Sequence, residues 1–138
     1  MMKSVSAKMG VKPTSRAILI NAPTEAVQAL ELPALDLETN LQGVFDYIHL
    51  FAITQAELKE QLPTLKGSLE QTGTLWVSWP KGGQRGTDLT LPKVIEIGYA
   101  HGLVESKSLS VNSTWSALKF THPREGKSYN NSYGNLKL

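Results

Sequence analysis

The pattern of apolar and polar positions predicts strands that alternate with helices along most of this chain. Continuous apolar runs at 16–21, 45–52 and 74–79 are bounded by turn-forming residues, as is typical of strands buried on both faces. Weaker strand patterns occupy 35–39, 103–111 and 114–121. Apolar residues recur at helical spacing in the segments between them, which predicts helices over 23–32, 54–73 and 88–102. Residues 1–13 are polar, and we assign no element to them.

The predicted helix over 54–73 has clear signals at both ends. Thr54 and Glu57 have the spacing of a capping box, in which each side chain bonds the other residue's backbone amide. Pro63 predicts a kink or two abutting helices, and Gly73 is expected to close the segment. One apolar stripe should face the sheet, formed by Leu58, Leu62, Leu65 and Leu69.

The order of these elements predicts the fold class. The helix over 88–102 should begin at Asp88 or Thr90, both good N-cap residues, and should end at Gly102. Strands that alternate with helices indicate a mostly parallel sheet with right-handed crossovers. Asn112-Ser113 separates the last two strands and indicates a closing hairpin. We therefore expect an α/β protein with a three-layer, Rossmann-like (methyltransferase-like), mostly parallel sheet and a C-terminal antiparallel hairpin.

The amino-acid composition further restricts the class of protein. The 138 residues are 41% hydrophobic and 19% charged, with a net charge of +2, which indicates a globular protein without the dense basic patch of a nucleic-acid binder. With no cysteine there is no thiolate metal site or cysteine nucleophile. No apolar stretch has the length of a membrane span or a signal peptide, so we expect a cytoplasmic protein. We expect one domain over 1–123 and a polar tail over 124–138.

The loop after the strand at 74–79 is the first place to look for a binding site. Open α/β sheets bind ligands beyond the carboxyl ends of their strands. Lys81 and Arg85 lie among glycines just before a helix, where cations, backbone amides and the helix dipole can hold a phosphate or carboxylate. The alternative is a solvated, flexible loop, and the spacing is not that of a P-loop. The candidate ligand-binding residues are Ser78, Trp79, Lys81, Arg85, Thr87, Asp88, Trp115 and Lys119.

No spacing in the chain identifies a catalytic group. Ser78 with Lys81 or Lys119 suggests a serine and lysine pair, and Asp46 with His49 an acid and base, but neither arrangement is diagnostic. The three histidines lack metal-ligand spacing. We therefore predict no catalytic residue, no metal site and no cofactor from the residues themselves.

The three tryptophans are interpreted mainly as core residues. Trp76 and Trp79 are three positions apart on a strand, so they should face opposite sides of the sheet. At most one of them should then meet Trp115, and an aromatic wall for a planar ligand is the less favoured interpretation.

Several segments resemble a bacterial protein family, the one catalogued as domain of unknown function 3052. The most specific are Trp76-Val77-Ser78-Trp79-Pro80-Lys81 and Trp115-Ser116-Ala117-Leu118-Lys119, and the resemblance runs from about Lys12 to Phe120. The other matching segments are 12–13, 17–23, 46–51, 87–90 and 114–120. This resemblance implies a fold but no catalytic residues, because that family has no established activity.

The order of elements is also similar to the second half of class I methyltransferases. That resemblance implies a cofactor loop with a glycine-rich turn after the first strand. Here the turn is Asn21-Ala22-Pro23, which has no glycine, and Pro23 lacks an amide donor. We therefore expect no standard cofactor binding at this turn.

Three functions remain open at this point. The first is a non-catalytic module that binds a small anionic ligand or a protein partner at the edge made by 79–88 and the closing hairpin. The alternative is a diverged, methyltransferase-like transferase that uses a nucleotide-like cofactor. The third is an interaction subunit that forms a homo-oligomer through an edge strand. A pocket with convergent polar groups would favour the first two, and a flat apolar patch the third.

Overall fold

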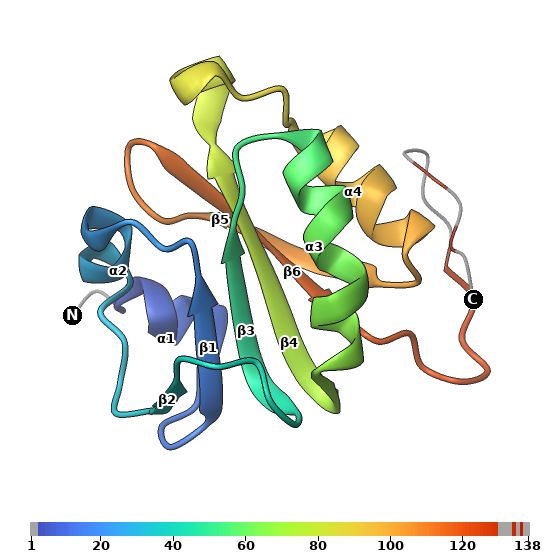
Figure 1. Cartoon of the computed structure of the whole chain (residues 1–138), viewed down its shortest axis with the longest axis horizontal. Coiled ribbons are helices and arrows are strands. Elements are labelled where there is room, and N and C mark those ends of the chain that lie inside the picture. The colour runs from blue at the N-terminus through green and yellow to red at the C-terminus, as the bar shows by residue number, and fades with distance from the viewer. Residues whose placement is uncertain (1–2, 130–133, 135, 137–138) are drawn as a thin grey trace.

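A computed structural model describes residues 3–129, 134 and 136. Six strands form one mixed sheet with the order β2-β1-β3-β4-β6-β5 (Figure 1). The strands are β1 (Arg16–Ile20), β2 (Asp36–Glu38), β3 (Phe45–Phe51), β4 (Leu69–Pro80), β5 (Val104–Ser110) and β6 (Trp115–Thr121). The helices are α1 (Val5–Met9), α2 (Thr24–Leu30), α3 (Gln55–Gly67) and α4 (Leu91–Ala100), with the short 3-10 segment η1 (Lys81–Gly86) after β4.

Strand directions confirm the predicted fold class. The pairs β1–β2, β1–β3 and β3–β4 are parallel. Strand β6 then runs antiparallel to both β4 and β5, as the closing hairpin predicted. The carboxyl ends of β1, β3 and β4 consequently meet at one edge of the sheet, at the top of Figure 1, where η1 follows β4.

Helices cover both faces of the sheet and make three layers (Figure 1). On one face, α3 and α4 bury Leu58, Leu62 and Val94 against strand residues such as Ile48 and Val77. On the other face, α1 and α2 pack their apolar residues with a second cluster that contains Tyr47, Trp76 and Trp115. Alternation along each strand sends neighbouring side chains to opposite clusters, which is why β4 contributes to both.

Helix α3 differs from its prediction at the C-terminal end. The capping box of Thr54 and Glu57 is present, but α3 continues through Pro63 and ends at Gly67, where Ser68 is the C-cap. Leu58, Leu62 and Leu65 are fully buried on both sides of the proline, and this packing holds the helix together. The predictions that Leu69 belongs to the helical stripe and that Gly73 ends the helix are wrong, because both residues lie in β4.

Two other element boundaries are informative. Residues 5–9 form α1, which the polar N-terminal segment did not predict. Ser4 caps it by accepting a hydrogen bond from the amide of Ala7, and Met9 is buried. For α4, Thr90 is the N-cap and accepts a bond from the amide of Lys93, so Asp88 does not cap that helix.

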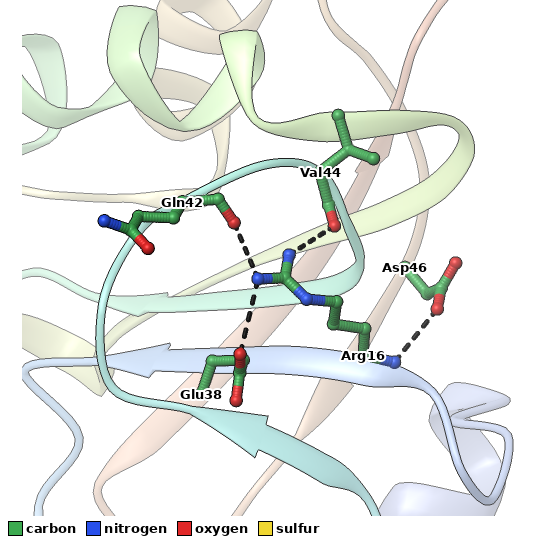
Figure 2. A network of polar contacts seen from close by, with 5 residues as sticks. All are labelled: Arg16, Glu38, Gln42, Val44 and Asp46. Atoms are coloured by element: carbon green, nitrogen blue, oxygen red, sulfur yellow. Dashed lines mark hydrogen bonds and ion pairs between the residues drawn. The ribbon is translucent and has the colours of Figure 1, made fainter.

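Arg16 fixes the connection between β2 and β3 (Figure 2). Its guanidinium donates to the carbonyls of Val44 at 2.6 Å and Gln42 at 2.7 Å, and to the Glu38 carboxylate at 3.4 Å. It also lies 4.1 Å above the ring of Phe45. The Arg16 amide donates to Asp46 at 2.9 Å. One side chain thus bonds two backbone carbonyls of this loop and ties it to β2 through Glu38.

The segment after β6 is described only in part. Tyr129 and Leu136 are half-buried against the α3–α4 core cluster, and the Tyr129 hydroxyl accepts a bond from the Arg124 amide at 2.9 Å. Residues 130–133, 135 and 137–138 of the predicted tail lie outside the described residues. Among the described residues, no helix has the length and apolar character needed to cross a membrane.

Candidate functional site

The turn η1 follows β4 at the carboxyl edge of the sheet, where sequence analysis placed the site. Gly82, Gly83 and Gly86 have φ angles of 53°, 77° and 69°, in the left-handed region that glycine adopts without steric cost. Arg85 also has a positive φ, of 55°, which is uncommon for a residue with a side chain. The backbone conformation of the turn therefore fixes the direction in which Arg85 leaves it.

Arg85 connects three elements at this edge. Its guanidinium donates to Glu25, in the first turn of α2, at 3.1 Å. The same guanidinium lies 5.6 Å from the ring centre of Trp115 at the start of β6. Both side chains of the ion pair are about half exposed, at 47% and 52%, so the pair contributes little to stability.

Lys81 is the first residue of the turn and contacts a residue of a small pocket. Its ammonium donates to the Ser110 hydroxyl at 2.5 Å. Ser110 also lines a pocket of about 220 Å³ together with Trp79, Leu91, Ser108, Leu109 and Ser116. This pocket opens between the start of α4 and the β5–β6 hairpin, so Trp79 and Lys81 meet the hairpin as the sequence suggested.

Thr87 and Asp88 join the turn to α3. The Thr87 hydroxyl donates to the carbonyl of Ile53 at 2.5 Å and accepts from the amide of Leu89 at 3.1 Å. The Asp88 carboxylate accepts from the amide of Gln55, the first residue of α3, at 2.8 Å. Of the two predicted N-cap candidates for α4, Asp88 and Thr90, Thr90 is therefore the cap, and the Asp88 charge lies at the N-terminus of α3.

Ser78 lies below this edge, in a closed chain of hydrogen bonds. His49 Nε2 is 2.7 Å from Ser78 Oγ, and His49 Nδ1 is 2.6 Å from the hydroxyl of Tyr47. His49 and Ser78 are fully buried, and Tyr47 is 2% exposed. Burial lowers the pKa of His49 to about 3 and raises that of Tyr47, so both rings are neutral.

The tryptophans and Lys119 do not gather into one ligand wall. Trp76 and Trp115 lie in the α1–α2 cluster, whereas Trp79 lies in the α3–α4 cluster on the opposite face, as their spacing predicted. Lys119 pairs with Trp76 along β6, whereas Trp115 pairs with Pro80 at the edge. Lys119 therefore lies away from Lys81 and Arg85, toward the middle of the sheet.

Two partners at this edge were missed by sequence reasoning. Glu25 pairs with Arg85, and His49 pairs with Ser78 rather than with Asp46. A local signal existed only for the contact between Tyr47 and His49, because residues two positions apart on a strand share a face. The contact between His49 and Ser78 depends on the pairing of β3 with β4. No sequence signal joins Glu25 to Arg85, since the contact depends on the positive φ at residue 85.

Comparison with solved structures identifies the fold. The chain resembles a ribosomal protein L11 methylase from Lactobacillus delbrueckii subsp. bulgaricus with a TM-score of 0.55, at 14% identity, over 86% of this chain and 75% of that one. It resembles the N-methyltransferase NodS from Bradyrhizobium japonicum with a TM-score of 0.57, at 13% identity, over 88% and 90%. It also resembles a TehB-like SAM-dependent methyltransferase from Corynebacterium glutamicum with a TM-score of 0.54, at 12% identity, over 86% of this chain and 85% of that one.

The chain therefore has the Rossmann-like fold of class I methyltransferases. No protein-family model and no curated protein match it, so membership of the domain of unknown function 3052 family is not confirmed. At these identities the likeness defines the fold alone.

The turn after β1 does not fit the cofactor of that fold class. Asn21 has a φ of 57°, a conformation that glycine would adopt freely. Pro23 is the N-cap of α2, makes no side-chain capping bond, and has no amide to donate. Of residues 21–23, Pro23 therefore offers no backbone donor, and Asn21 and Ala22 carry side chains where the expected cofactor turn has glycine.

Proposed function

We propose that this chain is a diverged transferase of the methyltransferase-like fold that holds a nucleotide-like, anionic cofactor at η1 rather than at the turn after β1. The observation that carries the proposal is the position of Arg85. This cation lies at the carboxyl edge between α2 and β6, and within the described part of the chain its partners are Glu25, in a half-exposed ion pair, and the ring of Trp115. Ligands of open α/β sheets bind at this edge.

The chemistry of the edge supports an anionic group on the ligand. A phosphate or carboxylate can replace Glu25 as the partner of Arg85 and accept two parallel bonds from the guanidinium. Lys81 adds a second positive charge on the same turn, and its ammonium now donates to Ser110. Gly82 and Gly83, with their positive φ, let backbone amides of the turn face the same ligand.

The second candidate function is a non-catalytic module that binds the same class of ligand. Its support is the burial of His49 and Ser78, which are both 0% exposed. A base and a hydroxyl sealed in the core cannot reach a substrate, so they supply no acid–base chemistry at this edge.

Calorimetric titration with S-adenosylmethionine, S-adenosylhomocysteine and ATP tests the proposal. At least one probe should bind, and the double variant Lys81→Ala, Arg85→Ala should bind it at least about tenfold more weakly, since each lost charged hydrogen bond contributes about 1.5–3 kcal/mol. The matched control is Lys93→Ala, which removes a 37% exposed cation from its 2.8 Å bond to Glu96. Binding to none of the three probes, or equal binding by the double variant, would overturn the proposal.

Isotope transfer then separates the two candidate functions. The protein is incubated with the bound cofactor labelled in its transferable group, together with a small-molecule extract of the host. Label that appears in an acceptor only with the parent protein supports the transferase. Tight binding without any transfer supports the module.

A further inference from the structure

A second polar pocket lies at the opposite edge of the sheet, far from η1 in the fold. It has a volume of about 330 Å³, which is within the range of small-molecule sites. Three segments line it: the turn 10–15 between α1 and β1, the start of β3 at Asp46 and Tyr47, and β4 at Thr72 and Thr74. The carboxyl edge contributes none of these residues, so this pocket is separate from the proposed cofactor site.

A bulge in β4 builds the floor of this pocket. Phe45 pairs with Leu69 and Tyr47 pairs with Thr74, so β4 advances five residues while β3 advances two. Gly73 permits the detour, because a Cβ there would lie 2.9 Å from the carbonyl oxygen of Phe45. Bulges of this kind redirect side chains, and here Thr72 and Thr74 face the hollow.

The wall of the pocket is a turn held in an unfavourable conformation. Thr14 has a φ of 66°, which is rare for a β-branched residue. The Thr14 amide donates to the carbonyl of Ala34 at 2.7 Å, and the Ser15 hydroxyl donates to the carbonyl of Lys12 at 2.8 Å. Strained residues that the surrounding structure holds in place are concentrated at binding sites.

Polar groups in the pocket are available for a ligand. Within the described ranges, the side chains of Lys12, Thr14, Thr72 and Thr74 make no hydrogen bond to the protein. Asp46 uses one carboxylate oxygen, Oδ2, to accept from the Arg16 amide, which leaves Oδ1 for another donor. Hydroxyls both donate and accept, Asp46 only accepts, and Lys12 only donates.

We propose that this pocket binds a small polyhydroxylated molecule that carries one anionic group, such as a sugar phosphate or a sugar acid. The ammonium of Lys12 pairs with the anion. Asp46 and the threonine hydroxyls bond the hydroxyls of the ligand, and the buried residue Tyr47 completes the lining.

Calorimetry with glucose 6-phosphate, gluconate, glucose and inorganic phosphate tests this proposal on the whole chain. The two anionic polyols should bind more tightly than glucose or phosphate. Lys12→Gln should weaken their binding about tenfold, the loss of one charge-assisted bond, and should leave glucose unaffected. Thr74→Val keeps the β-branched shape and removes the hydroxyl. It should weaken the binding of glucose 6-phosphate, gluconate and glucose.

Matched variants make the outcome decisive. Lys59→Gln and Thr64→Val change exposed residues of α3 and should bind as the parent does, as should the double variant of Lys81 and Arg85. Saturable binding of the anionic polyols that Lys12→Gln weakens about tenfold, but that these three variants keep at the parent affinity, supports the site. No saturable binding, equal affinity for phosphate alone, or equal losses in Lys59→Gln would each overturn it.

Discussion

The Nε2 atom of His49 lies 2.7 Å from the hydroxyl oxygen of Ser78, although 29 positions separate the two residues in the chain. They meet because β3 and β4 are neighbouring parallel strands that place both side chains on the α1–α2 face. Tyr47 completes the chain of hydrogen bonds at 2.6 Å, and Phe51 stacks on the His49 ring with centroids 4.4 Å apart. A polar chain this deeply buried stabilises the fold only while every member has its partner.

This arrangement predicts a pH dependence of stability. The pKa of His49 falls from 6.5 to about 3 on folding because burial disfavours the charged ring. Between about pH 3 and pH 6.5, the unfolded chain therefore binds a proton on His49 that the folded chain does not bind. The free energy of unfolding consequently rises with pH across this range. Above about pH 6.5, His49 adds nothing further to the pH dependence. The slope from this residue approaches about 1.4 kcal/mol per pH unit.

Urea denaturation at several pH values between about 4 and 7 measures this slope. In His49→Gln the slope should be smaller, because the glutamine side chain does not take up the proton that His49 binds in the unfolded chain. NMR of the parent protein gives an independent readout, in which the His49 imidazole should stay neutral at about pH 5. A His49 ring that titrates near its ordinary pKa would contradict the prediction.

The parallel strands β1, β3 and β4 could be predicted from sequence because they carry strong local signals. The apolar run of β1 and the capping box of α3 are local patterns, and each element begins where its pattern placed it. The end of α3 could not be read in the same way. Leu69 fits both a helical stripe and a buried strand, and its pairing with Phe45 decides for the strand.

The packing of α3 predicts a large loss of stability for Leu65→Ala. Leu65 is fully buried in the α3–α4 core cluster, and its truncation should lower the free energy of unfolding by about 2–5 kcal/mol. Leu37→Ala is the matched control, since Leu37 is 51% exposed and its truncation should change stability by less than about 0.5 kcal/mol. Equal midpoints in urea for the two variants would show that α3 does not bury this residue.

A close contact between α4 and β6 predicts the effect of a single methyl group. A Cβ at Gly98 would lie 2.1 Å from the ring of Phe120, and both residues are buried. Gly98→Ala should therefore destabilise the protein by about 1–3 kcal/mol through overpacking. Gly67→Ala adds the same group at the end of α3, where nothing lies within 4 Å, and should be neutral or slightly stabilising. The melting temperatures of the two variants should shift in opposite directions, or Gly98→Ala should cause a clearly larger shift than Gly67→Ala.

The site was predicted less completely than the fold, for a physical reason. Glycines at 82, 83 and 86 indicated a turn, and the turn is there. The direction of Arg85 depends on its own positive φ, and its partner Glu25 lies 60 positions away on another element. Spacing along one strand does not encode such contacts, whereas it did encode the opposite faces of Trp76 and Trp79.

The last prediction is that S-adenosylmethionine does not bind at the turn after β1. Asn21-Ala22-Pro23 offers no glycine for close approach, and Pro23 offers no amide. A ligand at about a hundred times its dissociation constant stabilises a fold by roughly 2.7 kcal/mol, which thermal unfolding detects easily. If millimolar S-adenosylmethionine raises the melting temperature, the rise should survive Ala22→Phe and disappear in Arg85→Ala, because the cofactor would then be held at η1. The opposite result is a rise that disappears in Ala22→Phe and survives in Arg85→Ala. It would place the cofactor at the turn after β1, and it would contradict both this prediction and the role proposed for Arg85.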